Sequence, residues 1–138
     1  MANLSITATA VVPSTSAVKL NGKAGETVAA GEIVYLTSTS NTYSLADAND
    51  NTKLPAAGIA GNSAGTGQAL QVIVSDPSLT IGTHGVALGT PYFLSRTAGK
   101  ACPLADLTTG DYTTAVFITK TTTTVAFGIL AGGAAIPA

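Results

Sequence analysis

The sequence is poor in the side chains from which disulfides and metal sites are made. It has one cysteine, Cys102, and one histidine, His84, among 138 residues. A lone cysteine excludes a disulfide within the chain, and one cysteine with one histidine cannot build a zinc site of nitrogen and sulfur ligands. A single domain of this length buries enough surface to fold without either. We therefore expect no cofactor and no structural metal.

Charge is also scarce. Asp, Glu, Lys and Arg make up 9% of the residues and the net charge is −1, whereas an ordinary soluble domain has about 25% charged residues. No basic field is present to hold nucleic acid or an anionic membrane, so neither is an expected partner. A surface of Ser, Thr, Asn, Gly and Ala suits packing against copies or another protein, because few charges need to be desolvated. An extracellular domain with a neutral surface is the alternative.

The residue pattern predicts neither export nor membrane insertion. The first residues, 1–6, contain no Lys or Arg and no long apolar core, so we do not expect them to form a signal peptide. The last apolar stretch, 125–138, is too short and too rich in Gly and Ala to span a bilayer. We expect a protein made in the cytoplasm.

The pattern that is present predicts an all-β fold. Short runs of Thr, Val, Ile and Tyr alternate with Gly, Pro, Asn or Asp roughly every ten residues. Residues 3–10 alternate apolar and polar side chains, which predicts a strand with one buried face. Pro13 and the Ser/Thr cluster after it end this run. We therefore expect residues 1–18 to form an extended N-terminal arm and residues 19–138 to form a single β-domain.

Further strands are predicted where apolar side chains share a face or cluster. These segments are 32–37, 70–74, 92–95, 115–119 and 124–130. The segment 44–53 is predicted as a loop with room for a short helical turn, because its Asp and Asn side chains bond to their own backbone.

An internal repeat organises these strands. The stretch 28–36 aligns with 86–94, 45–47 aligns with 104–106, and 57–60 aligns with 115–118, all near an offset of fifty-eight residues. Gly31 and Gly89 take equivalent places, where a turn before a strand needs a residue that tolerates positive φ. Two such β-units predict a compact β-barrel or β-sandwich, since neither unit alone buries enough apolar surface.

A search for catalytic residues finds no complete arrangement. His84 lies in a Gly-rich loop without a nucleophile elbow, and it is interpreted as a turn residue. Cys102, next to Pro103, is interpreted as a small buried apolar residue. The segment 47–51 lacks the glycine and distal glutamate of a calcium loop, and 61–67 lacks the Gly-Lys-Ser/Thr ending of a phosphate loop. The former is predicted as an acidic turn and the latter as a hairpin connection. The chain is therefore expected not to be an enzyme.

Seven carboxylates nevertheless leave an enzymatic alternative open. Two of them acting as a glycosidase pair would make the chain a small carbohydrate-active domain. The absence of Trp and the low aromatic content of 5% count against a sugar-cleaving cleft.

One phrase of the sequence resembles a known family. The stretch 24–36, AGETVAAGEIVYL, resembles the opening of capsid cement (decoration) proteins of tailed bacteriophages, and the likeness continues as a loose pattern of glycines and apolar positions to about residue 131. The resemblance implies a β-barrel or β-tulip-like fold on the outside of the virion. The implied role is a structural protein that binds the major capsid protein, bridges its copies, and forms homo-oligomers, with a trimer favoured.

The N-terminal arm is the candidate contact with the capsid or with a neighbouring copy, through an added strand. The alternative is that the same arm pairs within its own domain. A head-fibre or tail-fibre module that binds a host glycan is the alternative function. The candidate contact residues are Leu4, Ile6, Ala8, Ala10, Val11 and Val12.

Overall fold

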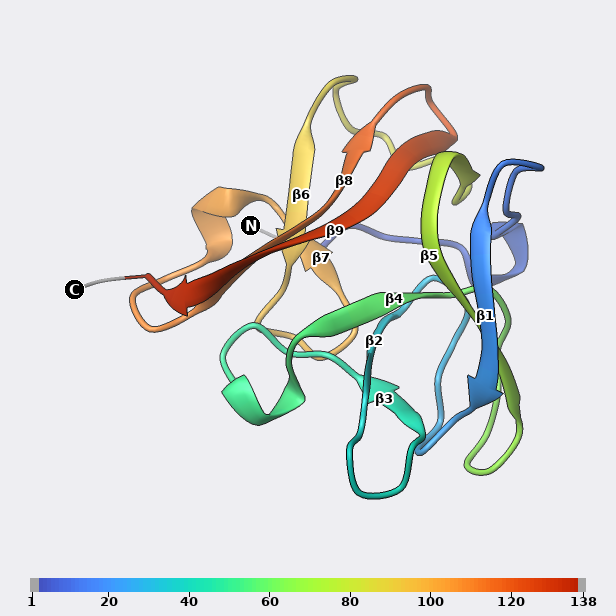
Figure 1. The fold of residues 1–138 in the computed structure, drawn as a ribbon. Coiled ribbons are helices and arrows are strands. Elements are labelled where there is room, and N and C mark those ends of the chain that lie inside the picture. The colour runs from blue at the N-terminus through green and yellow to red at the C-terminus, as the bar shows by residue number, and fades with distance from the viewer. Residues whose placement is uncertain (1–2, 137–138) are drawn as a thin grey trace.

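The computed structural model describes residues 3–136, in which nine strands form one curled antiparallel sheet (Figure 1). The all-β prediction is confirmed, and the sheet has the shape of a half-barrel. Helical structure in the described chain consists of three single turns, η1 (Ala8–Ala10), η2 (Asn51–Lys53) and η3 (Leu104–Asp106). The strands are β1 (Val18–Lys23), β2 (Ile33–Leu36), β3 (Tyr43–Leu45), β4 (Ala56–Ala60), β5 (Ala69–Thr80), β6 (Pro91–Leu94), β7 (Ala101–Cys102), β8 (Tyr112–Thr119) and β9 (Thr124–Ala135).

The order of the strands in the sheet shows the predicted duplication. Neighbouring strands follow the order β3-β2-β4-β5-β9-β8-β6-β7, so the second four mirror the first four about the β5–β9 pair. Gly31 donates its N–H to Ala60 O at 2.8 Å, and Gly89 donates to Thr119 O at 2.8 Å. Both glycines have positive φ, +91° and +79°, as their place in the sequence predicted.

The two units also share their irregularities. The β2–β4 ladder shifts register between Val34 and Tyr35, and the β6–β8 ladder shifts between Tyr92 and Phe93. The later part of the sequence alignment needs a correction of one residue, because Ala56 takes the place of Ala115 in these ladders. A one-residue change is small in sequence but reverses the face to which a strand side chain points.

β1 belongs to the repeat, although the sequence did not predict a strand there. Leu20 pairs with Val72 in the first unit as Leu79 pairs with Val125 in the second. β1 therefore pairs with β5 in the first unit, and the second half of β5 pairs in the same way with β9 in the second unit. This double role explains why β5 has twelve residues and a register irregularity between Asp76 and Leu79.

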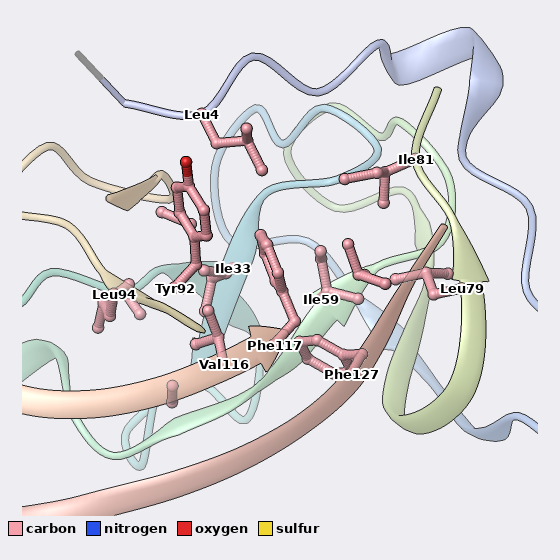
Figure 2. Packing of buried hydrophobic residues seen from close by; sticks show 14 of the residues in the cluster. Leu4, Ile33, Ile59, Leu79, Ile81, Tyr92, Leu94, Val116, Phe117 and Phe127 are labelled. Atoms are coloured by element: carbon pink, nitrogen blue, oxygen red, sulfur yellow. The ribbon is translucent and has the colours of Figure 1, made fainter. Parts of the chain in front are cut away.

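The core lies inside the curl of the sheet (Figure 2). Ile33, Ile59 and Ile73 form a fully buried row across β2, β4 and β5, and the second unit contributes the stacked rings of Tyr92 and Phe117, whose centroids are 5.4 Å apart. A second, smaller cluster forms around Val28, Val34, Tyr43, Ala60, Leu70 and Val72 in the first unit.

In the N-terminal segment, residues 3–17, the strand predicted at 3–10 does not form. Its backbone makes scattered bonds, such as Leu4 N–H to Ala101 O at 2.8 Å, and η1 interrupts it. The alternation of side chains is nevertheless real, since Leu4 is buried while Ser5, Thr7 and Thr9 are exposed. One face of the segment covers the open side of the core, and this packing requires no ladder of hydrogen bonds.

Candidate interaction surface

His84 holds two loops together. Its Nδ1 accepts the N–H of Val86 at 3.2 Å, and its Nε2 lies 2.6 Å from Thr121 O. Because Nδ1 is the acceptor, the proton is on Nε2, which donates to the carbonyl. The ring thus ties the 82–88 loop to the β8–β9 turn, and both ring nitrogens are engaged in these contacts. The structure gives His84 a structural contact where the sequence suggested a turn residue.

Cys102 is buried, as predicted. Its residue is 1% exposed and lies in the main core on β7. Burial raises the pKa of the Cys102 thiol above its ordinary value, and the nearby carboxylates of Asp106 and Asp111 add to this effect against a hydrogen bond with Ser95. A thiol with a raised pKa is a poor nucleophile near neutral pH, because the thiolate is the reactive form.

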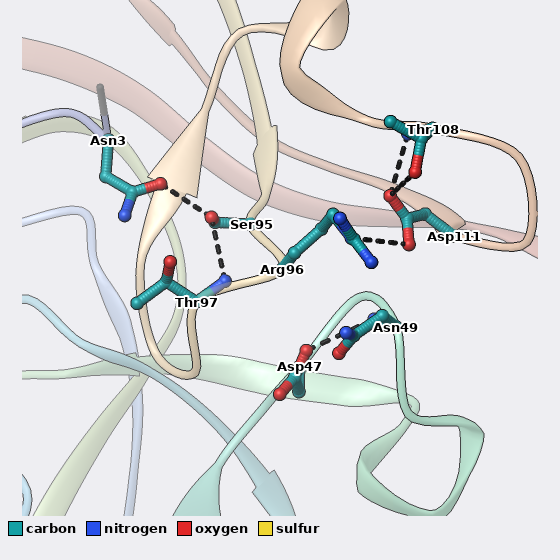
Figure 3. Close-up of polar contacts among 8 residues, drawn as sticks. All are labelled: Asn3, Asp47, Asn49, Ser95, Arg96, Thr97, Thr108 and Asp111. Carbon is teal, nitrogen blue, oxygen red and sulfur yellow. Dashed lines mark hydrogen bonds and ion pairs between the residues drawn. The ribbon is translucent and has the colours of Figure 1, made fainter. Parts of the chain in front are cut away.

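Two of the carboxylates are buried, and each fixes a loop. Asp111 is 2% exposed, accepts the Thr108 N–H at 2.8 Å and pairs with the Arg96 Nε at 3.1 Å (Figure 3). Asp76 accepts the Ser14 N–H at 2.7 Å and the Ser78 N–H at 2.9 Å. Lys120 lies close enough to contribute a favourable charge to Asp76. Both carboxylates thus accept backbone N–H groups and hold the conformation of the loops around them.

The acidic segment 47–51 folds as the predicted turn. Asp47 Oδ1 accepts the Asn49 N–H at 3.1 Å, and Asp50 caps η2 by accepting the Thr52 N–H at 3.0 Å (Figure 3 shows the first pair). The segment 61–67 connects β4 to β5 as a hairpin, as predicted. Within residues 3–136, no three His, Cys, Asp or Glu side chains gather as metal ligands.

The residues predicted to contact a capsid or a neighbouring copy have mixed positions. Leu4 and Val11 are buried in the core of their own chain, and Ile6 and Ala8 pack against it. Contact with another chain through these side chains would require the segment to leave its own domain. Val12 is 56% exposed and pairs with Thr80 through its backbone. The intermolecular role of the full set, which also includes Ala10, stays a prediction.

The strands themselves carry almost no charge. From β2 to β9 the only ionisable acidic or basic side chain is that of Asp76, which is buried. Lys19 and Lys23 lie in β1, and every other Asp, Glu, Lys and Arg lies in a connection. The outer surface of β2–β9 consequently carries no exposed charged side chain, whereas β1 carries Lys19 and Lys23.

One apolar row of the second unit is exposed, whereas the equivalent row of the first unit is buried in the core. Ile118 pairs with Pro91 on one side and with Ala126 on the other, across β6, β8 and β9. The backbone equivalents in the first unit are Ile33, Ile59 and Ile73, all 0% exposed. Ile118 is instead 50% exposed, and Pro91 and Ala126 are also exposed.

This exposed row was not predicted from the sequence. Its apolar residues match core residues in the repeat, so the sequence pattern marks them as buried. The one available signal was the one-residue offset in the alignment, which shifts side chains between the two faces of a strand. The three paired residues Pro91, Ile118 and Ala126 are named here the Ile118 face.

Comparison of the chain with protein-family models, curated proteins and solved structures returned no match. In residues 3–136, no helix is long and apolar enough to cross a membrane.

Proposed function

We propose that this chain is a non-catalytic structural protein that binds the outside of a bacteriophage capsid and stabilises the shell by bridging its major capsid proteins. The observation that carries the proposal is the Ile118 face. An apolar row on strands without an exposed charge is suited to close contact with another protein, because its burial removes apolar surface from water and desolvates little charge. The charge nearest to Ile118 in the sequence is Lys120, whose Nζ donates to Pro77 O at 3.0 Å.

The capsid as partner comes from the sequence resemblance, and the neutral sheet supports it. A small contact of this kind gives modest affinity by itself. On a shell that displays many identical sites, a bridging protein engages several of them, and the second contact forms at high effective concentration. Weak single contacts are therefore sufficient for a stabilising role.

Cosedimentation with purified, expanded and undecorated heads tests the proposal. We expect saturable binding and a higher temperature of shell disruption in the decorated heads. Absence of binding to the cognate heads would contradict the proposal. Binding of the isolated protein to a glycan array would then support the alternative of a fibre module.

A pair of matched variants identifies the surface. Ile118→Lys places a charge in the centre of the Ile118 face, and Leu104→Lys makes the same change at an equally exposed position, 52% against 50%, on η3. We expect Ile118→Lys to weaken head binding at least tenfold and Leu104→Lys to leave it close to that of the unchanged protein. Equal binding by both variants would assign the contact to another surface.

A further inference from the structure

The second half of β9 has one edge with which no strand of residues 3–136 forms a ladder, although β4 lies close to β9. β8 pairs with β9 as far as Tyr112–Ala135, whereas on the opposite edge β5 pairs with β9 only between Thr124 and Gly128. Residues 129–135 therefore present a row of backbone N–H and C=O groups on the side away from β8. Figure 1 shows this half of β9 continuing past β5 alongside β8.

Other open edges of the sheet are protected, and this one is not. β3 has three residues and β7 has two, and such short strands offer little backbone for pairing. β1 has six residues, but Lys19 and Lys23 place charge along it. β9 has twelve residues without a charge or a proline. A long edge strand without charge or proline is prone to pair with a strand of another molecule, and natural proteins seldom leave such an edge unpaired.

The first unit shows what the equivalent edge requires. β5 and β9 hold equivalent places in the two units, so the second half of β5 is the counterpart of the second half of β9. One edge of this half of β5 pairs with β9, and the N-terminal segment covers the other edge. Val12 exchanges two backbone hydrogen bonds with Thr80, each 3.0 Å long, and Ser14 bonds to Asp76. No segment of the described chain covers β9 in this way. A strand from another molecule could pair with this edge.

We propose that a second copy of this chain supplies it, with residues 129–135 of two copies pairing antiparallel about a two-fold axis. In such a pair Gly132 meets its own counterpart and Leu130 lies opposite Ala134 of the other copy, so like charges in the strand would lie close together and repel one another. The absence of charge from β9 permits this arrangement. Leu130, 74% exposed and therefore the most exposed large apolar side chain of those described, lies in this half of the strand and becomes buried by the contact.

This inference deepens the proposed function, on which its biological purpose rests, because a two-fold pair carries two Ile118 faces and thus a means of bridging. The pairing itself is a property of the isolated protein. It also differs from the trimer that the resemblance implies, so a mass measurement separates the two arrangements.

Light scattering after size-exclusion chromatography gives the mass of the full chain in solution. We expect twice the 13.5 kDa of one chain. Leu130→Lys should shift the protein to monomer without lowering its unfolding temperature, because the side chain is exposed in the single chain. Leu36→Lys, at a site on β2 that is 45% exposed, should leave the dimer intact. A monomeric or trimeric unchanged protein, or equal behaviour of the two variants, would overturn the pairing.

Oxidative cross-linking gives a second, independent readout that does not depend on how the lysine variant folds. Gly132→Cys, at the position that meets its own counterpart across the two-fold axis, should form disulfide-linked dimers much faster than Leu36→Cys, and buried Cys102 should not compete. Equal rates would overturn the proposal. Head binding by Leu130→Lys distinguishes the two conclusions. If this variant is monomeric and still binds heads, self-pairing and capsid binding are separate properties. If the unchanged protein is a dimer but binds no heads, only the proposed function is contradicted.

Discussion

Ser14 and Asp76 replace a missing part of a β-ladder. Val12 pairs with Thr80, and β1 from Lys19 onward pairs with β5 in the same register. Between these two stretches lie Pro13 and Pro77, which have no N–H to donate. The Asp76 carboxylate closes this gap by accepting both the backbone N–H and the hydroxyl of Ser14.

The first prediction is that the Ser14–Asp76 contact contributes measurably to stability. Asp76→Asn should lower the free energy of unfolding by about 1–3 kcal/mol, because the amide cannot accept all of the bonds that the buried carboxylate accepts. Ser14→Ala should cost about 1 kcal/mol, since the backbone N–H bond remains. Urea unfolding measures both. Ser16→Ala, at an exposed neighbouring position, serves as the control and should stay within about 0.5 kcal/mol.

The same contact predicts how stability depends on pH. Burial alone would raise the pKa of Asp76, but the hydrogen bonds from Ser14 and Ser78 and the charge of Lys120 outweigh it, so the pKa lies below the ordinary 3.8. A carboxyl group with a lowered folded-state pKa stabilises the fold above its unfolded pKa, and this contribution is lost as the pH falls through the folded value. The difference in unfolding free energy between the unchanged protein and Asp76→Asn should therefore be constant near neutral pH and shrink below about pH 4. A difference that does not change down to pH 2 would contradict this assignment.

The repeat was readable from the sequence because its markers are local. Gly31 and Gly89 are required by their backbone conformation, and the apolar runs that follow them form β2 and β6. Strands β1, β3 and β7 were not predicted, and the segment of β4 was marked only by its alignment with 115–118. β1 is almost wholly exposed, and β3 and β7 have three and two residues. An exposed strand that pairs through its backbone leaves little apolar pattern to detect.

The candidate surface was not readable, for a different reason. Ile59 and Ile118 occupy equivalent backbone positions and are chemically identical, yet the first is buried and the second is half-exposed. Which face of a strand meets the core depends on irregularities such as the shift between Asp76 and Leu79 in β5. These arise from tertiary pairing, which the residue pattern of one strand does not specify.

This pair yields a third prediction. Ile59→Ala should destabilise the fold by about 2–5 kcal/mol, because it leaves a cavity among closely packed side chains. Ile118→Ala should change the unfolding free energy by less than about 1 kcal/mol, since water already reaches half of the side chain. Denaturant unfolding of the two variants compares the same substitution at equivalent positions. Similar losses would show that Ile118 is buried in the protein in solution.

The last prediction concerns Gly31 and Gly89, which precede β2 and β6. Alanine at either position is strained by the positive φ, at a cost of about 1–2 kcal/mol. At Gly89 an added Cβ meets nothing within 4 Å, whereas at Gly31 it would lie 2.5 Å from Ile6 Cγ2 and 3.2 Å from Val11 Cγ2. Gly31→Ala should therefore cost more than Gly89→Ala, because it also pushes the N-terminal segment away from the core. Amide exchange separates this displacement from backbone strain: the Leu4 and Val12 amides should exchange faster in Gly31→Ala and at an unchanged rate in Gly89→Ala. Equal exchange in both variants would mean that Ile6 moves aside without loosening the segment.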